Sequence, residues 1–382
     1  MSKTRSIFEE VSSEKPASDV SKGGSKGGLI DAGKTGARRA IAVWLMVLFA
    51  LVALMILVGG MTRLTDSGLS ITEWKPVTGA IPPLSEAVWS DEFAKYQATP
   101  EYQLQNKGMS LSEFKTIFWW EWGHRQLGRL VGLVWALGFF YFLLRRQIPK
   151  GWTGRLLLVG GLGGLQGAIG WWMVSSGLTG RMVDVASYRL ATHLGLAFII
   201  LCVLIWYAWQ LQRREMDLFQ SRRNQEKPLV TLSTVMLALV FAQILLGALV
   251  AGIDAGRGYI DWPLMNGEFL PSESFDYVPF WTNFFENPAL VQFNHRMLGY
   301  VVLLGSLYLW FSSRSSAIVA TRRAALIALG MVVAQMVMGI VTVMHAAPVH
   351  LAIFHQVGAV IVIVSILNVR FSALYPKAQK LR

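Results

Sequence analysis

Two similar stretches, "IFWWEWGHRQLGRLVGLV" (Ile117–Val134) and "VQFNHRMLGYVVLLGSLYLW" (Val291–Trp310), decide the fold of this chain. Each carries a His-Arg pair, headed by His124 in the first and by His295 in the second, and then continues as an apolar run. An ionisable pair at the start of such a run is typical of a membrane helix near the polar interface. The recurrence predicts an internal repeat in which a histidine has a defined place.

Composition excludes most soluble classes of protein. Of the 382 residues, 53% are hydrophobic and only 15% are charged, which is more apolar surface than a soluble chain can bury. The formal net charge is +12, but Lys and Arg cluster at the ends of apolar segments, which favours lipid headgroups over nucleic acid as the partner. The single cysteine, Cys202, lies in an apolar run, so one chain cannot build a disulfide framework, a zinc site or an iron–sulfur site.

Apolar segments of about 20 residues predict an all-α membrane protein with eight transmembrane helices. They are expected at 39–62, 122–144, 155–174, 188–210, 229–252, 291–312, 323–344 and 349–370.

The loops differ in charge. Those at 145–155, 211–228 and 313–323 are biased towards Lys and Arg, whereas the long loops 63–121 and 253–290 carry more acids than bases. The positive-inside rule therefore predicts that both termini and the basic loops are cytoplasmic. In a bacterium the membrane would be the inner membrane, with the long loops in the periplasm.

The chain contains an internal repeat. Asp66 pairs with Asp254 and Gly68 with Gly256 (254 − 66 and 256 − 68 are both 188), and "QGAIGWW" around Gln166 matches "QMVMGIV" around Gln335. We expect two parallel four-helix bundles related by a pseudo-two-fold axis along the membrane normal. The expected parts are a disordered cytoplasmic tail (1–38), an N-terminal half (39–212), a cytoplasmic linker (213–228), a C-terminal half (229–372) and a cytoplasmic tail (373–382).

Four of the six histidines occupy the even-numbered spans: His124, His193, His295 and His355. At about 1.5 Å per residue they lie roughly 22–31 Å from the cytoplasmic ends of their helices, within the outer half of the membrane. Imidazole is a strong ligand for iron, copper and zinc, and two histidines from facing helices can clamp a planar haem. One pair in each half predicts two haem-sized sites; the alternative is a set of histidines hydrogen-bonded to neighbouring helices.

Basic side chains accompany these histidines. Arg125, Arg129 and Arg296 lie next to or about a turn from them, where anionic propionates would need partners. The alternative is that these arginines extend to lipid headgroups. His345 and His350 flank the short turn before the last span, and we expect them to be loop residues.

The two halves differ in one acid. Glu121 stands three residues before His124, on the same helical face, whereas Gln292 stands three residues before His295. A carboxylate can move protons or stabilise a developing cation. The difference predicts one reactive haem site and one that only carries electrons; the structural alternative is an interfacial acid paired with Arg125.

Several motifs together resemble the haem A synthase family. They are "GGMTRLTDSGLSITEWKPVTGAIPPL" (Gly59–Leu84), "EWGHRQLGR", "ATHLG", "FNHRMLGY" and "IFHQVGA", and the resemblance covers roughly residues 39–372. It implies an oxidoreductase that converts the C8 methyl group of haem O to a formyl group by successive hydroxylations, giving haem A for cytochrome oxidase.

The resemblance also implies roles for residues. His295 and His355 would bind haem b as a cofactor, with Arg296 beside it, and His124 and His193 would bind the iron of the substrate haem. Glu121 matches the acid of the family's Glu-x-x-His motif. The residues expected to bind the substrate's edge are Arg63, Trp74, Lys75, Arg125 and Arg129, with haem O entering from the lipid.

Some bacterial members of that family carry a cysteine pair in the first outer loop. This chain has none there, so it resembles the branch without the pair, and no disulfide relay is expected through that loop. Haem O and membrane lipid are the expected partners. A haem O synthase, an electron acceptor and further copies of the chain remain candidates.

Two other functions compete with this one. A dihaem b-type cytochrome would carry electrons from quinol, but such proteins stack haems across the membrane, and here the histidines share one depth. A transporter also fits parallel repeats, but almost every charge lies near the end of a span.

Overall fold

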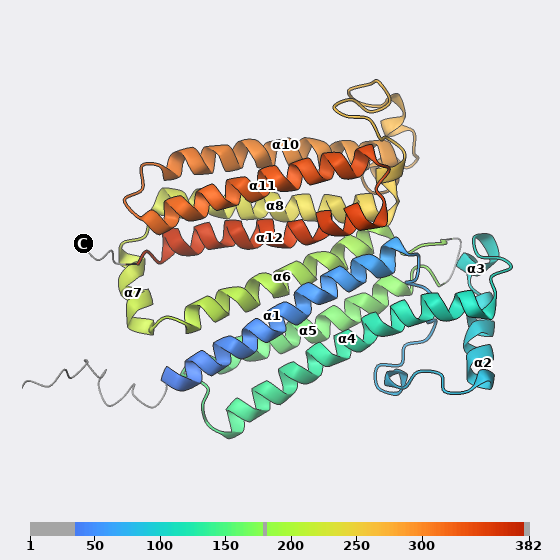
Figure 1. The fold of residues 1–382 in the computed structure, drawn as a ribbon, viewed down its shortest axis with the longest axis horizontal. Helices are drawn as coiled ribbons and strands as arrows, with labels where there is room; N and C mark the ends of the chain where they lie inside the picture. Colours follow the sequence, from blue (N-terminus) through green and yellow to red (C-terminus); the bar gives the residue numbers. More distant parts are fainter. Residues whose placement is uncertain (1–34, 179–181, 378–382) are drawn as a thin grey trace, which may run out of the picture.

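The computed structural model describes residues 35–178 and 182–377, and the elements of this part are helices (Figure 1). The long ones are α1 (Thr35–Leu64), α4 (Leu111–Leu144), α5 (Thr153–Val174), α6 (Ser187–Leu211), α8 (Lys227–Gly252), α10 (Pro288–Ser313), α11 (Val319–Met344) and α12 (Val349–Leu374). The short ones are α2 (Glu86–Gln97), α3 (Pro100–Leu104), α7 (Glu215–Arg223) and α9 (Asn283–Glu286). Short 3-10 turns lie at Thr78–Ala80, Ala255–Arg257, Ser272–Phe275 and Phe280–Thr282.

Seven of the described helices are long and apolar enough to cross a membrane: α1, α4, α5, α6, α8, α11 and α12. The chain is therefore an all-helical, multi-pass membrane protein. The remaining expected span, 291–312, corresponds to α10. This helix is long enough to cross a membrane but is not among the seven. Polar residues at both of its ends, Gln292–Arg296 and Ser312–Arg314, shorten its continuous apolar run.

Several helix boundaries differ from those expected. α4 begins at Leu111 rather than near residue 122, because Ser110 and Glu113 form a capping box that starts a helix above the apolar run. α1 begins at Thr35, inside the expected tail, and residues 1–34 lie outside the described part. The expected linker contains α7, and residues 378–382 of the expected C-terminal tail also lie outside the described part.

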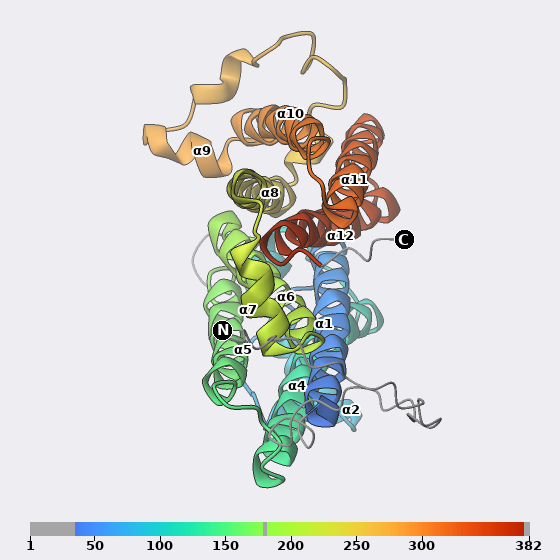
Figure 2. The ribbon, with the colours of Figure 1, turned by 90° about the vertical axis from the view of Figure 1, so that its left-hand side faces the viewer.

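Four helices form the middle of the molecule. α1 contacts α6 and α12, and α8 contacts α6 and α12. α4 and α5 lie on one side of this group, and α10 and α11 lie on the other (Figure 2). Because lipid tails are as apolar as leucine, close packing and interhelical hydrogen bonds rather than burial hold such helices together. One such bond runs from Gln356 Nε2 of α12 to the carbonyl oxygen of Ile56 in α1, at 2.6 Å.

The long connection between α1 and α4 folds into an outer cap (residues 65–110). It packs on the first turns of α4 through an aromatic cluster in which Tyr96 and Phe114 are fully buried. The two rings stack at 5.3 Å, and Trp89 meets Phe118 edge-on at 4.9 Å. The extension of α4 beyond its apolar run therefore serves as the platform for this cap.

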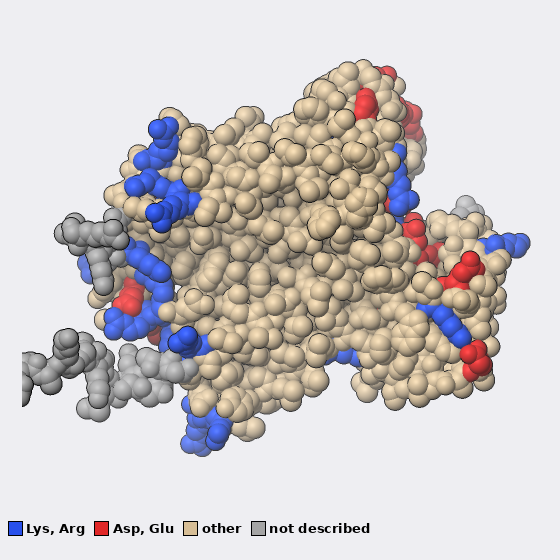
Figure 3. Space-filling model, in the orientation of Figure 1, with Lys and Arg blue, Asp and Glu red and all other residues tan. Residues whose placement is uncertain are grey.

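Charged side chains gather at the two ends of the helices (Figure 3). Lys and Arg dominate the end where α7 lies, named the basic end, and the acids are mainly at the opposite end, named the loop end, which carries residues 65–110. On the face shown, the band between the two ends is almost free of charge, as a lipid-facing surface requires.

Candidate functional site

The imidazoles of His295 on α10 and His355 on α12 lie beside each other. Their ring centroids are 6.3 Å apart, and the ring planes meet at 82°. Imidazole nitrogens bind metals at about 2 Å, so an iron held between two imidazoles separates the ring centres by roughly 6 Å. The spacing of this pair suits a shared iron.

His124 on α4 and His193 on α6 take the matching places in the N-terminal half and lie within electrostatic range of each other. Each of the four rings packs against a glycine of a neighbouring helix. The pairs are His124 with Gly59 of α1, His193 with Gly170 of α5, His295 with Gly247 of α8, and His355 with Gly339 of α11. The structure therefore backs all four predicted histidines with a glycine and brings the rings of His295 and His355 into contact.

The available donors suit haem better than a small metal ion. Among residues 35–178 and 182–377, no group of three or more His, Cys, Asp or Glu side chains could hold a metal ion. Structural zinc and similar sites need about four protein ligands, whereas a haem iron takes only its axial ligands from the protein. Two neutral nitrogens in a partly buried, apolar setting fit an axially bound haem.

Glu121 is 2% exposed and bonds to the outer cap and to Arg125. Its Oε2 accepts hydrogen bonds from Ser70 Oγ at 2.7 Å and from the backbone N–H of Ile71 at 2.8 Å. Its Oε1 accepts from Nη2 of Arg125 at 2.6 Å and from Nε at 3.0 Å. The structural alternative, an acid paired with Arg125, is thus present in the fold. Several donors hold this carboxylate about a turn from His124.

In the C-terminal half, Gln292 takes the place of Glu121. Its Nε2 donates to the carbonyl oxygen of Ala255 at 2.8 Å, and its Oε1 accepts from Arg296 Nη2 at 3.0 Å. Arg296 also donates to the carbonyl oxygens of Tyr259 and Asp261, as Arg125 donates to those of Ile71 and Glu73. In both halves the arginine after the histidine fastens the outer loop to its helix.

The remaining predicted cap residues form a second group. Arg129 donates to the carbonyl oxygens of Lys75 and Pro76, both at 2.9 Å. Trp74 is 47% exposed, and its ring lies 5.2 Å from Trp171, the residue after Gly170. The cap therefore reaches the helix that backs His193.

Lys75 is tied to an acid of the cap. Its ammonium lies 2.6 Å from the Glu73 carboxylate, and this hydrogen bond raises the pKa of Lys75 and lowers the pKa of Glu73. Lys95 shares the same Glu73 carboxylate at 2.9 Å. Because all these groups are substantially exposed, the cluster positions the side chains more than it stabilises the fold.

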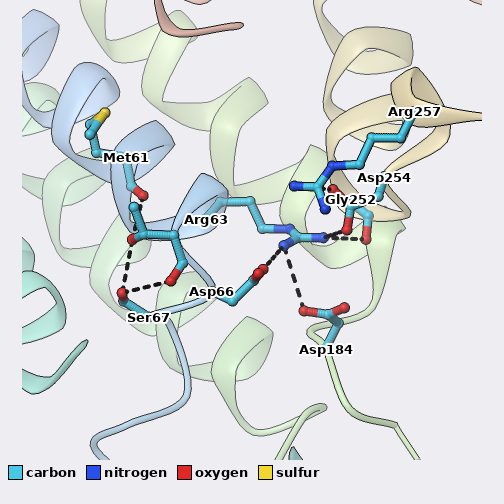
Figure 4. Close-up of polar contacts among 9 residues, drawn as sticks. Met61, Arg63, Asp66, Ser67, Asp184, Gly252, Asp254 and Arg257 are labelled. Atoms are coloured by element: carbon cyan, nitrogen blue, oxygen red, sulfur yellow. Dashed lines mark hydrogen bonds and ion pairs between the residues drawn. The ribbon is translucent and has the colours of Figure 1, made fainter. Parts of the chain in front are cut away.

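Arg63 lies at the end of α1 in a cluster of acids (Figure 4). Its guanidinium binds Asp66 at 2.7 Å, Asp254 at 3.1 Å and Asp184 at 3.6 Å. Among the residues described, it makes no hydrogen bond or ion pair to Trp74, Lys75 or Glu121. It joins the ends of α1 and α8, which come from different halves.

A cavity of about 720 Å³ lies between the outer cap and the ends of α5 and α6. Thr72, Lys95 and Thr99 line it from the cap, and Trp171, Ser175 and Arg189 line it from the helices. Since Trp171 follows Gly170, this cavity comes within one residue of the backing of His193.

One buried acid lies in the cap itself. Glu101 of α3 is 2% exposed, and burial raises its pKa to about 8. The cap therefore carries a titratable group near neutral pH that sequence analysis did not predict.

His345 and His350 are both exposed. His345 follows the last residue of α11, whereas His350 lies in the first turn of α12 and not in a loop as expected.

Comparison with known proteins finds relatives that match this chain over nearly its whole length. A family model described as COX15-CtaA, cytochrome oxidase assembly protein, matches residues 42–367. The chain belongs to the haem A synthase family. It is 63% identical to the haem A synthase of Dinoroseobacter shibae, with 100% of this chain and 99% of the relative covered. It is 57% identical to that of Roseobacter denitrificans (100% and 100%) and 55% identical to that of Paracoccus denitrificans (99% and 98%). Membership predicted from the motifs is confirmed.

Some residues of the site could have been found from the sequence, and others could not. Ser70 and Glu101 have no periodic signature, because they act through loop contacts. Gln243 and Met55 do have one: each stands four residues before a glycine that backs a histidine.

Proposed function

We propose that this chain is a haem A synthase that oxidises the C8 methyl group of haem O to a formyl group, with substrate bound between His124 and His193. The observation that carries the proposal is the paired arrangement of four imidazoles, with a carboxylate beside one pair only. Membership of the family supports the reaction. The relatives named haem A synthase match this chain over 99% and 100% of their own length.

Haem b is the proposed cofactor, and His295 and His355 would hold its iron. The centroid spacing of 6.3 Å supports this, and so does Arg296, whose buried Nε has no hydrogen-bond partner within the described part of the chain. Haem b supplies one-electron transfer when bound. His295 and His355 fix its iron, and Arg296 offers a donor to a propionate.

Glu121 is the proposed reactive-site acid. The Ser70, Ile71 and Arg125 donors hold it in place, so its carboxylate presents its charge at a fixed position. Such a charge stabilises positive charge that develops as electrons leave the substrate methyl. It also fastens the outer cap over the substrate and helps to exclude water.

The edge of the substrate is proposed to lie under the outer cap. Trp74 and Trp171 offer an aromatic wall, with their rings tilted at 59° to each other, and Arg125, Arg129 and Lys75 lie on or beside the cap. Because the arginines already donate to loop carbonyls, binding of propionates would add to or replace those bonds. Arg63 is proposed to act at the substrate's edge only through the acids it binds.

The architecture proposed is two four-helix halves with eight spans. α1, α4, α5 and α6 would correspond to α8, α10, α11 and α12, giving halves at 39–212 and 229–372 with a linker at 213–228. The interface supports a pseudo-two-fold axis, since α1 contacts α12 and its counterpart α8 contacts α6. The cytoplasmic tails would be 1–38 and 373–382.

The proposed location is the bacterial inner membrane, with both termini in the cytoplasm and the haem sites towards the periplasm. The gathering of Lys and Arg at the basic end supports this orientation (Figure 3). Haem O and lipid are the proposed partners, with haem O synthase, an electron acceptor and a second copy of the chain as further candidates.

Chromatography of extracted haems tests the proposed reaction. Membranes from cells that make haem O, with and without this chain, are compared. Haem A is expected only with the chain, and a His124→Ala variant should leave haem O unconverted. Bound haem without any haem A would instead favour an electron-carrying dihaem cytochrome.

A further inference from the structure

The four histidines share a packing motif that extends beyond the rings themselves. A methyl group at Gly170 or Gly339 would clash with the imidazole, and one at Gly59 or Gly247 would press tightly against it, so glycine lets each ring lie close to the neighbouring helix. The distances would be 3.2 Å at Gly59, 2.9 Å at Gly170, 3.1 Å at Gly247 and 2.8 Å at Gly339. The nearest ring atom is Cε1 at three of the sites and Nε2 at His124, so the ring of His124 is turned differently.

Three of the four rings also have a glutamine partner, four residues before the backing glycine. Gln243 Nε2 lies 3.2 Å from Nδ1 of His295, and Gln335 Nε2 lies 3.1 Å from Nδ1 of His355. Gln166 Nε2 lies 3.3 Å from both Nδ1 and Nε2 of His193, and Gln243 Nε2 also lies 3.4 Å from Nε2 of His295. Each amide also donates to the backbone carbonyl of its histidine, at 2.9, 2.7 and 3.0 Å in the same order.

At the fourth site the corresponding residue is Met55. A methyl group at Gly128 would meet Met55 Cε at 3.4 Å, and one at Gly299 would meet Gln243 Nε2 at the same distance. The two side chains therefore occupy equivalent places, on α1 and α8. A thioether accepts hydrogen bonds weakly and donates none, so His124 lacks the amide that the other three histidines have.

The chemistry of axial ligation gives the amide a role. A neighbouring side chain that holds a ligating ring in one orientation strengthens the bond of that ring to the metal. Each amide lies against a ring nitrogen and also donates to the backbone carbonyl of the same histidine, so it fixes the histidine against the neighbouring helix.

We propose that Gln166, Gln243 and Gln335 are positioning residues for three haem-ligand histidines, and that Met55 leaves His124 as the ligand that releases most readily. The inference rests on the proposed function. A substrate haem must bind and leave while a cofactor stays, so the two sites need unequal ligand strength. The asymmetry places the exchangeable bond on the α1–α4 side of the N-terminal site.

Exchanging the two residues tests the proposal. Met55→Gln should slow loss of haem from the N-terminal site, and Gln243→Met should speed loss of haem b, each by roughly 10-fold, the lower bound for removing a ligand's partner. The measurement is transfer of haem from purified protein to an excess of apomyoglobin. Met46→Gln is the matched control, since Met46 lies on the same helix and packs in the core instead of against His124.

A spectroscopic readout separates positioning from mere stability. Gln243→Leu and Gln335→Leu should shift the low-spin electron paramagnetic resonance signal and the midpoint potential of haem b. Gln356→Leu should not, because that glutamine adjoins His355 but donates to Ile56 of α1. Unchanged spectra and exchange rates in haem-loaded variants would overturn the inference, whereas wild-type protein that binds no haem would overturn the proposed function instead.

Discussion

The two halves differ at residues that decide what each haem site can do. Glu121 occupies the position in the first half that Gln292 occupies in the second half. Met55 and Gln243 are equivalent in the same way. The first difference gives the N-terminal site a fixed charge, and the second leaves its histidine without an amide partner. Both differences fall on the same site, which agrees with one site that transforms and releases its haem and another that keeps it.

At this scale, Glu121→Gln tests the charge. The amide keeps the shape of the side chain but removes the negative charge beside His124, so conversion of haem O should fall by roughly 100-fold or more. The measurement is haem A formed per mole of protein. Haem b content should stay at the wild-type level, because Gln292 already occupies this place in the other half.

The control for that variant is Glu113→Gln. Glu113 lies two turns earlier on the same helix, where it caps the helix with Ser110. It should retain conversion at close to the wild-type rate. Full conversion by Glu121→Gln would contradict the role assigned to the carboxylate.

Among the elements, the outer cap has a built-in pH dependence. Burial raises the pKa of Glu101 to about 8, so between its ordinary pKa and 8 the folded cap holds a proton that the unfolded chain loses. The stabilisation is therefore complete at low pH and is lost as pH rises through 8. Hydrogen exchange of α2 and α3, corrected for intrinsic rates, should show faster opening at pH 9 than at pH 6.

Glu101→Gln provides the comparison for the cap. An amide cannot ionise, so the difference in opening between the two pH values should disappear. A pH dependence that persists in this variant would assign it to other groups in the cap.

Helix periodicity made the elements more predictable than the loops. The histidines on α4, α6, α10 and α12 could be placed from apolar runs and their spacing, since a span has a fixed length. The early start of α4 required recognising the Ser110–Glu113 capping box. The bonds of Glu121 to Ser70 and of Arg125 to Ile71 could not be predicted, because they join a non-periodic loop to a helix about 50 residues away in the sequence.

Across the whole molecule, the loop and basic ends should lie on opposite sides of the membrane. In a Cys202→Ala background, Lys107→Cys in the outer cap should react with an impermeant maleimide in intact cells. Lys150→Cys at the basic end should react only after the membrane is opened. Both lysines are exposed, so access and not burial decides the outcome. The reverse pattern would overturn the orientation.

The most direct measurement of the account is the haem b spectrum of purified histidine variants. His295→Ala and His355→Ala should each lose the bound haem b, whereas His124→Ala and His193→Ala should keep it and lose only the conversion of haem O. A wild-type haem b spectrum in His295→Ala or His355→Ala would contradict the central claim.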